Sequence, residues 1–502
     1  MRPSRVNVWV SGLVAAVILA PVAVLFMLSL GADVDVIGQI AAITVNSLAL
    51  ALLTVLGSVA IGVPLALVTS YADLPGRRFW VATLSAPLAV PSYLGAFAFF
   101  AAFGPGGELS VLSGLPLPPV KGLAGATVVM TLYTFPFVLL STRAALAGLD
   151  VSVLEAARTL GMPLPMALWK VVLPRVRNGI AAGALLVALY TLSDFGTPAL
   201  LQLDTFTRVI FVEYNAFGLD RAALLSLQLL GFVALILLLE SRLRASRERP
   251  GRTMTLKLPG AIKALCLVAA SVIVLAALVL PVAIFTLWLV RDGAVGFDPG
   301  YLLNSVYVSL LAAVATVLVA LPVAFAASAG RLGRLFERIT YLGFGIPGIV
   351  LGTALVYLGL QLSFLYQTVT LLVVAYVIRF LPLAVGAVRA TLARRNNDLT
   401  GAARSLGASS FEVFRRISLP LSLPGLVAGA ALVFLEAMRE LPATLMLRPT
   451  GFETIGTYLW RTYEAGYFGR GAIPGLLLML VSAVAVMMMV LGEGRLSRRH
   501  SR

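Results

Sequence analysis

The sequence contains very few of the side chains that form disulfides, soft metal sites and histidine-based catalytic centres. It has one cysteine, Cys266, and one histidine, His500, in 502 residues. A single cysteine excludes a disulfide framework, and a single histidine near the end of the chain offers no acid–base pair. Metal ligation could use only oxygen atoms, so the sequence leaves a metal site unknown and predicts no cofactor.

Charged residues are also scarce. They make up 12% of the chain, whereas soluble domains carry about 25%, and 60% of the residues are hydrophobic. Apolar runs of about twenty residues or more recur along the chain, and each is long enough to cross a hydrocarbon core of about 30 Å as a helix. The sequence therefore predicts an all-α integral membrane protein and excludes an ordinary soluble fold.

The apolar runs predict about twelve transmembrane helices in two groups of six. The first run is longer than the core of a signal peptide, so we expect it to be a retained helix. The first group is expected at residues 8–30, 46–70, 80–103, 122–142, 179–201 and 222–240. The second group is expected at residues 264–290, 304–328, 339–361, 369–390, 425–447 and 472–492.

The formal net charge of +16 could suggest a nucleic-acid partner. Most Lys and Arg residues, however, gather at the two termini and in alternate loops, and the remaining loops hold few of them. Cytoplasmic loops of membrane proteins carry such an excess of Lys and Arg. We therefore expect both termini in the cytoplasm, contact with membrane lipid, and no binding of nucleic acid.

A polar, basic segment at residues 241–263 separates two halves, residues 1–240 and 264–502. Six helices per half would give both halves the same orientation in the membrane, which is a common plan among transporters. The sequence thus predicts two six-helix halves, a cytoplasmic linker and a central pathway between the halves.

The two halves are also similar in sequence. Asn46-Ser47 opens an apolar run in the first half, and Asn304-Ser305 opens the corresponding run in the second. Both runs carry a proline at the same point. This match predicts an internal repeat.

A long loop after the fourth helix of each half carries the most specific pattern in the chain. The first copy reads SVLEAARTLGMPLPMALWKVVLPR from residue 152, and the second reads DLTGAARSLGASSFEVFRRISLPL from residue 398. Each has an N-cap residue, a short helix, a Gly that can end it in the left-handed conformation, a second short helix, and a Pro that starts the next span. Both copies predict a helix-turn-helix on the inner face.

These loops resemble the E-A-A-x3-G-x9-[IV]-x-L-P signature of permease subunits of binding-protein-dependent ABC importers. The resemblance implies the type I permease fold, and it implies that the first short helix couples the permease to an ATPase subunit. One position departs from the signature, because a glycine stands where the second copy should have glutamate, so unequal coupling is expected. The matching residues are Glu155, Ala156, Ala157, Gly161 and Pro174 in the first copy and Gly401, Ala402, Ala403, Gly407 and Pro420 in the second.

Glu155 has two possible roles at this point. It could contact the ATPase subunit, as the resemblance implies. It could also form a capping box with Ser152, in which each side chain accepts a hydrogen bond from the other residue's backbone N–H. The two roles can coexist. The alanines suit close contact with a partner, but alanine is also the best helix former.

Two acidic residues, Asp194 and Glu440, lie within predicted spans at matched positions of the two halves. Ionisable groups at this depth usually face the bundle interior or an aqueous cavity, and helix-breaking residues follow both. They are candidate pathway residues, together with Glu436 and Arg439. The alternative for these last two is structural, because residues three apart on a helix can form an ion pair.

The segments LSDFGTPALL and MRELPATLML around these acids resemble the fused permease of the ferric-iron importer family, over nearly the whole chain. The resemblance implies import of ferric iron through the bacterial inner membrane. It also implies two ATPase subunits and a separate periplasmic or lipid-anchored solute-binding protein as partners. Ferric iron prefers oxygen ligands, which the lack of Cys and His does not oppose. Fused thiamine permeases and permeases for phosphonate, sulfate or molybdate share the plan and are alternatives.

A twelve-helix secondary transporter of the major facilitator type is a less favoured alternative. It also has two parallel six-helix halves, but it gives no reason for two matched loops. An enzyme is not expected. The chain has no G-x-x-x-x-G-K-[ST] phosphate-binding loop, so a separate subunit would have to hydrolyse ATP.

Overall fold

The computed structural model describes residues 5–32, 37–150, 152–242, 259–393, 402–403 and 405–484 of the 502-residue chain. Every regular element within these ranges is a helix. The predicted all-α membrane fold is therefore confirmed.

Nine of the described helices are long and apolar enough to cross a membrane. Two further pairs of helices pass the same test together but bend sharply at a short break, which raises the number to eleven. The last predicted span, residues 472–492, continues past the described residues, which end at Val484. These helices are consistent with the predicted twelve.

The described helices form two compact units, and each unit combines separate pieces of the chain. Unit 1 comprises Met1–Asp33, Ile210–Leu227 and Asp298–Tyr458. Its helices are α1 (Arg5–Ser29), α15 (Gly300–Ala329), α16 (Arg331–Gly345), α17 (Gly348–Gln361), α18 (Val369–Ala393), α20 (Ser410–Val413), η4 (Phe414–Ser418), α21 (Leu419–Met438) and α22 (Pro442–Leu447).

Unit 2 comprises Val34–Val209, Gln228–Phe297 and Leu459–Arg502. Its elements include α2 (Ile37–Tyr71), α3 (Arg77–Ser85), η1 (Ala86–Ala89), α4 (Ser92–Ala102), α5 (Glu108–Ser113), α6 (Gly122–Ala147), α7 (Ser152–Thr159), α8 (Leu164–Ala167), η2 (Leu168–Val172), α9 (Leu173–Ser193), α10 (Gly196–Leu200), α13 (Gly260–Val274), η3 (Leu275–Val279), α14 (Leu280–Asp292) and η5 (Phe468–Gly471). Three helices divide between the units: α11 (Phe206–Asn215), α12 (Leu219–Arg242) and α23 (Ile455–Glu464).

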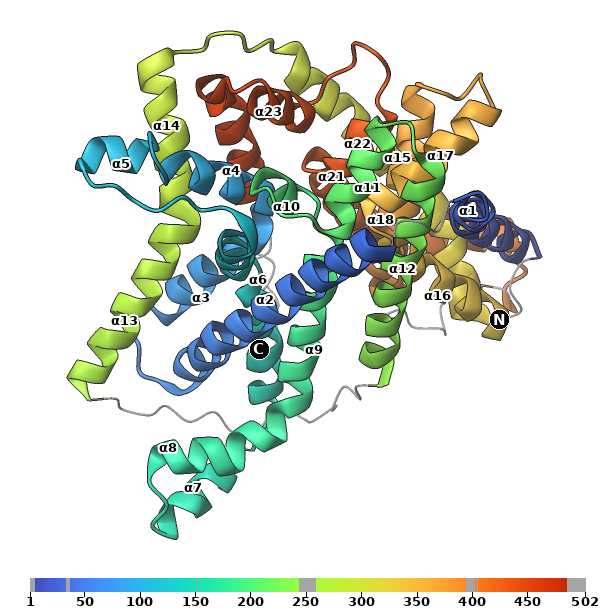
Figure 1. Ribbon diagram of the computed structural model, residues 1–502. Coiled ribbons are helices and arrows are strands. Elements are labelled where there is room, and N and C mark those ends of the chain that lie inside the picture. The colour runs from blue at the N-terminus through green and yellow to red at the C-terminus, as the bar shows by residue number, and fades with distance from the viewer. Residues whose placement is uncertain are drawn as a thin grey trace. The chain divides into compact units, whose positions relative to one another are not determined.

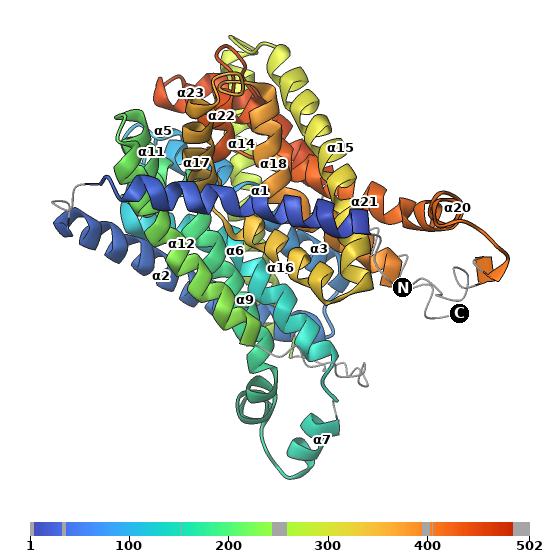
Figure 2. The ribbon, with the colours of Figure 1, turned by 90° about the vertical axis from the view of Figure 1, so that its right-hand side faces the viewer.

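The first helix of each predicted half packs on helices of the other half. In unit 1, α1 contacts α15, α16 and α17, and Figure 2 shows it lying across α16. In unit 2, α13 contacts α2 and α3, and α14 contacts α4. The compact units therefore differ from the two sequence halves. The division at residues 240 and 264 concerns the sequence repeat and stays a prediction, and residues 243–258 of the linker lie outside the described residues.

Small residues let the membrane helices of each unit approach closely. In unit 2, Gly62 of α2 lies against the backbone of α6, and the hydroxyls of Ser58 and Thr134 form a hydrogen bond of 3.0 Å between the same two helices. In unit 1, Gly429 of α21 lies against Ala384 of α18. Such contacts are typical of helix packing in membranes, where association depends on close backbone approach.

The third predicted span of each half is broken at a proline. Val90 and Ile346 have extended backbone, with ψ of 127° and 119°, and they precede Pro91 and Pro347. The angle is 90° between α3 and α4 and 101° between α16 and α17. The prediction of continuous helices here is wrong, because a residue before proline avoids the helical conformation and proline has no N–H to continue the hydrogen-bond ladder.

A π-helical turn precedes the fifth predicted span of each half. The turns η2 and η4 precede Leu173-Pro174 and Leu419-Pro420, at matched positions of the two copies. The wider turn gives room for the proline ring, which would otherwise meet the carbonyl four residues earlier. The chain from Leu164 to Ser193 is consequently one long helix, whereas the sequence predicts a separate short helix before Pro174.

The internal repeat extends to individual hydrogen bonds. In unit 2, the Asn46 side chain donates to the carbonyl of Asp204 at 3.1 Å, and the Ser47 hydroxyl accepts from the N–H of Phe206 at 3.0 Å. In unit 1, the corresponding Asn304 and Ser305 make the same two bonds, of 2.9 Å to the carbonyl of Glu453 and 2.8 Å from the N–H of Ile455. The matched Asn-Ser pairs thus hold the starts of α11 and α23.

The turns after α11 and α23 differ in one residue. Each helix ends with an N–H bonded to a carbonyl five residues earlier, from Gly218 to Glu213 and from Tyr467 to Thr462, both at 2.9 Å. The left-handed residue before that N–H is Gly466 in one turn (φ 71°) and Phe217 in the other (φ 61°). A side chain at such φ is strained, and the Phe217 side chain is 94% exposed, so no packing offsets the strain.

We expect Phe217→Gly to raise the free energy of unfolding by about 1 kcal/mol, because glycine adopts this φ without strain. Chemical denaturation in detergent would measure it. The control is Phe364→Gly, since Phe364 is 75% exposed and its φ is not positive. That change should lower stability slightly. An equal loss of stability in both variants would show that Phe217 is unstrained.

Candidate functional site

The first matched loop, residues 152–175, leads into the N-terminal end of α9. It forms a helical hairpin made of α7 and α8 (Figure 1). After α7 the chain turns at Gly161, whose φ is 83°. The N–H of Met162 donates to the carbonyl of Ala157 at 3.1 Å, and the N–H of Gly161 donates to the backbone carbonyl of Arg158 at 3.0 Å. These bonds form a Schellman motif. The predicted left-handed helix stop at Gly161 is confirmed.

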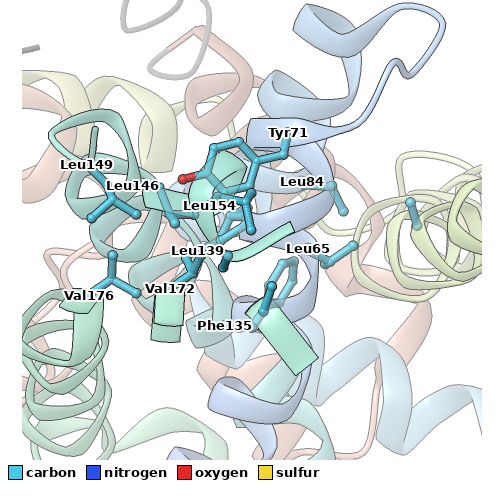
Figure 3. Packing of buried hydrophobic residues seen from close by; sticks show 14 residues of the cluster. Leu65, Tyr71, Leu84, Phe135, Leu139, Leu146, Leu149, Leu154, Val172 and Val176 are labelled. Atoms are coloured by element: carbon cyan, nitrogen blue, oxygen red, sulfur yellow. The ribbon is translucent and has the colours of Figure 1, made fainter. Parts of the chain in front are cut away.

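One face of α7 is packed against its own unit. Leu154 is 1% exposed, and Figure 3 shows it among Tyr71, Leu146 and Val172. Ala157 belongs to the same apolar cluster and is 8% exposed. Ala157 therefore faces its own chain, and its small side chain lets α7 approach this cluster. Burial of this face fixes the position of α7 relative to α2, α6 and α9.

The other face of α7 is open to solvent. Glu155 and Ala156 are exposed, and so is Arg158. Leu160, immediately before the glycine, is 87% exposed. The loop signature does not include this leucine, which lies in its x3 segment. The signal available was its recurrence, because Leu406 stands before Gly407 in the second copy and is also 87% exposed.

The first loop is capped differently from the prediction. The N–H of Ser152 donates to the carboxylate of Asp150 at 3.0 Å and not to Glu155. Within the described residues, no hydrogen bond joins Ser152 and Glu155, so the capping box does not form. Asp150 provides the cap, and the carboxylate of Glu155 stays exposed in the first turn of α7, where the helix dipole favours a negative charge.

The second matched loop repeats the turn of the first. Gly407 has φ 84°, and the N–H of Ala408 donates to the carbonyl of Ala403 at 3.0 Å. Ala402 is exposed and Ala403 is half-buried. Figure 2 shows α20 beyond the end of α21, so this loop also extends from its membrane helix. Gly401 lies outside the described residues, as does the predicted N-cap residue, Asp398.

The second loop contains a capping box that was not predicted, at the start of its second short helix. The N–H of Ser409 donates to the Glu412 carboxylate at 3.0 Å, and the N–H of Glu412 donates to the Ser409 hydroxyl at 3.2 Å. The S-x-x-E spacing could have predicted this cap.

Asp194 follows the C-terminal end of α9, and its carboxylate binds the start of α10, the short helix that continues the same span. The sequence predicts a span over 179–201 with helix-breaking residues after Asp194, and α9 indeed ends at Ser193 before the separate α10. The Asp194 carboxylate accepts hydrogen bonds from the N–H of Thr197 at 2.9 Å and from the hydroxyl of Ser92 at 2.6 Å. Because Ser92 begins α4, the acid joins the helix breaks of two spans.

Glu440 has the same position in unit 1. It follows the end of α21, and its carboxylate accepts from the N–H groups of Ala443 at 3.1 Å and Thr444 at 3.0 Å, at the start of α22. The predicted span 425–447 is therefore broken as well, at the helix-breaking residue that follows the acid. Helix N-termini stabilise negative charge, which explains how both acids can occupy apolar spans.

Glu440 has a cation from another helix beside it. A guanidinium nitrogen of Arg379 lies 3.8 Å from the Glu440 carboxylate, whose side chain is 2% exposed. A methyl group on Gly348 would overlap this pair, so the glycine leaves room for it. In the first half, the position aligned with Arg379 is Tyr133, whose hydroxyl donates to the carbonyl of Ala277 at 2.8 Å. The second half thus pairs its acid with a cation from α18.

Glu436 and Arg439 form the ion pair that their spacing predicts, in the last turn of α21. Both side chains are partly exposed. Within the described part of the chain, no group of three or more His, Cys, Asp or Glu side chains is arranged to hold a metal ion. The acids at these breaks can offer oxygen atoms singly to a passing cation.

Comparison with known proteins adds an independent line of evidence. Residues 316–498 match the family described as binding-protein-dependent transport system inner membrane component. An Fe(3+)-transport system permease protein of Haemophilus influenzae is 30% identical over 461 residues, 88% of each chain. A ferric transport system permease protein of Actinobacillus pleuropneumoniae is 24% identical over 76% of this chain and 60% of its own. A probable molybdenum ABC transporter permease protein of Haloferax volcanii is 33% identical over 39% of this chain and 72% of its own.

Proposed function

Because the chain belongs to the family of inner membrane components of binding-protein-dependent transport systems, we propose that it is the permease of an ATP-driven ferric-iron importer. Membership of this family excludes a secondary transporter of the major facilitator type. The observation that carries the proposal is the similarity to an Fe(3+)-transport permease over 88% of both chains. The inner membrane is its location, with both termini in the cytoplasm.

The two matched loops each dock on one subunit of a separate ATPase dimer. Their exposed leucines, Leu160 and Leu406, are apolar side chains that a partner surface can bury, and Gly161 and Gly407 set the direction in which those leucines point. Glu155 adds a charge in the first loop only. Ala156 and Ala402 face the partner, whereas Ala157 packs α7 against the apolar cluster of its own chain.

The helix breaks at Asp194 and Glu440 line the translocation pathway, with Glu436 and Arg439 nearby. Broken helices at matched positions of two repeats often form the binding region of a transporter, because the break frees backbone groups and helix ends. A periplasmic or lipid-anchored solute-binding protein delivers the iron.

An oxyanion substrate is the second candidate, because one relative is described as a molybdenum permease and others as 2-aminoethylphosphonate permeases. Arg379 beside Glu440 is the feature that favours it, since an arginine fork matches oxyanion oxygens.

Reconstitution would distinguish these proposals. The permease, its ATPase and its binding protein would be placed in proteoliposomes, and uptake of labelled ferric iron and molybdate would be compared. We expect iron uptake that requires both ATP and the binding protein. Molybdate uptake without iron uptake would overturn the substrate, and iron uptake without the ATPase would overturn the importer proposal itself.

Glu155→Gln should weaken binding of the ATPase by about tenfold, which corresponds to about 1.4 kcal/mol, because an exposed charge that lacks a partner in its own loop is free to pair across the interface. Titration of the purified ATPase onto the permease in detergent would measure this. The control is Glu412→Gln, where glutamine can complete the capping box with Ser409. Wild-type affinity of the Glu155 variant would mean that the charge makes no contact.

A further inference from the structure

We infer that the first half of α16 binds the phosphate of an anionic phospholipid headgroup. Arg331, Arg334 and Arg338 follow one another at three or four residues along α16, and all three side chains are exposed. Residues at this spacing share one face of a helix. Together with Leu335 they line an open surface hollow of about 240 Å³. The hollow is therefore surrounded by three positive charges.

The grouping of three arginines at the start of α16 is unfavourable unless an anion is present. Like charges at these spacings repel one another, and cations at the start of a helix oppose its dipole. The acid on the same helix, Glu337, is buried and pairs with Arg389 of α18. Within the described ranges, none of the three arginines forms an ion pair with a protein carboxylate. A bound phosphate would relieve both sources of instability.

The first half uses its arginine differently. The corresponding loop begins α3 with Arg77, which donates to the carbonyl of Ser70 at 2.7 Å and to that of Thr69. These carbonyls lie in the last turn of α2, so this arginine caps a helix of its own unit. Both loops belong to the set rich in Lys and Arg, but only the second exposes three arginines along one face of a helix.

The surface of α16 indicates a lipid as the source of the phosphate. Besides the arginines, it exposes apolar side chains: Leu332, Leu335, Tyr341, Leu342 and Phe344 are each between 44% and 52% exposed. A helix that exposes both basic and apolar residues is typical of a membrane interface. Arginine forks bind phosphate oxygens in pairs. The inference rests on the orientation proposed above, which places α16 at the cytoplasmic leaflet, where anionic lipids gather.

Native mass spectrometry of the detergent-purified chain would measure binding of phosphatidylglycerol and of the zwitterionic phosphatidylcholine. We expect selective binding of phosphatidylglycerol. Each arginine near an anionic headgroup contributes about fivefold to affinity, so R331Q/R334Q/R338Q should lower it by about a hundredfold, and R334Q alone by about fivefold. Replacement of all three by lysine should retain most of the affinity, because the charge stays.

The matched control removes three other exposed arginines, in R175Q/R177Q/R415Q. An equal loss of lipid in this control would show that net charge alone attracts the lipid, and it would overturn the site. Displacement of the lipid by inorganic phosphate at the same concentration would overturn the lipid as ligand. The measurement needs no ATPase, binding protein or iron, so failure of the transport proposal would leave it interpretable.

Discussion

Gly161→Val is expected to reduce ATP-driven import by more than tenfold while the membrane helices stay folded. A Cβ at this position has open space, because nothing beyond the chain neighbours lies within 4 Å of it. The difficulty is the backbone, since a φ of 83° is strained by about 1–2 kcal/mol for a residue with a Cβ, and more for a β-branched one. Valine would relax φ, break the bond from Met162 to Ala157, and turn Leu160 away from the ATPase. Gly407→Val should act in the same way through Leu406.

Two further variants separate conformation from side-chain size. Asparagine adopts the left-handed conformation more readily than other residues with a Cβ, so Gly161→Asn should retain most of the import. Gly231→Val adds the same side chain in open space within α12, at a glycine whose φ is not positive, and should import normally. Uptake and ATP hydrolysis would be measured together in proteoliposomes. An Asn variant as inactive as the Val variant would contradict the role assigned to the turn.

The sequence predicted the loops correctly where the physical constraint is local. A glycine at the same point in two copies indicates a left-handed stop, and both Gly161 and Gly407 have that conformation. The cap at Ser152 was predicted wrongly for an equally local reason. The carboxylate of Asp150, two residues before Ser152, takes the N–H that a capping box would give to the carboxylate of Glu155.

The break in the third span at Pro91 could not be predicted from the sequence alone. Pro64 and Pro136 lie inside continuous helices, whereas Pro91 breaks its span. A β-branched residue precedes both Pro64 and Pro91, so the local sequence does not distinguish them. The difference is tertiary, because the chain after Pro91 is held by the bond between Ser92 and Asp194, which are far apart in sequence.

The sequence shows that Asp194 and Glu440 are unusual, because they lie in apolar spans. It did not lead us to predict the backbone N–H groups that bind their carboxylates. A carboxylate in an apolar span is unfavourable by itself, and this led to the prediction of a pathway role for Asp194 and Glu440. In both places, threonine N–H groups at the start of a short helix offset much of that instability. The spacing of acid and threonine in DFGT and ELPAT is a cap signal, and it stands beside the helix-breaking residues that the sequence places after each acid.

Glu440→Gln is expected to destabilise the protein by about 3 kcal/mol, the largest effect predicted here on stability. Glutamine can still accept a hydrogen bond from the N–H of Ala443 or Thr444. It cannot neutralise Arg379, which is 20% exposed and would be left as a charge without its partner. Asp194→Asn is the matched comparison, because the Asp194 carboxylate is held by N–H and hydroxyl donors from Thr197 and Ser92, and it should lose about 1–2 kcal/mol.

The cause can be isolated by removing the arginine as well. If the unpaired charge is responsible, Arg379→Met combined with Glu440→Gln should recover stability to within about 1 kcal/mol of the wild type, since a charge pair replaced on both sides leaves nothing uncompensated. Chemical denaturation of all four members of the cycle in one detergent would give the coupling energy. Additive losses in the double variant would mean that Glu440 acts only through the helix N–H groups. In that case its ion pair with Arg379 contributes nothing to stability.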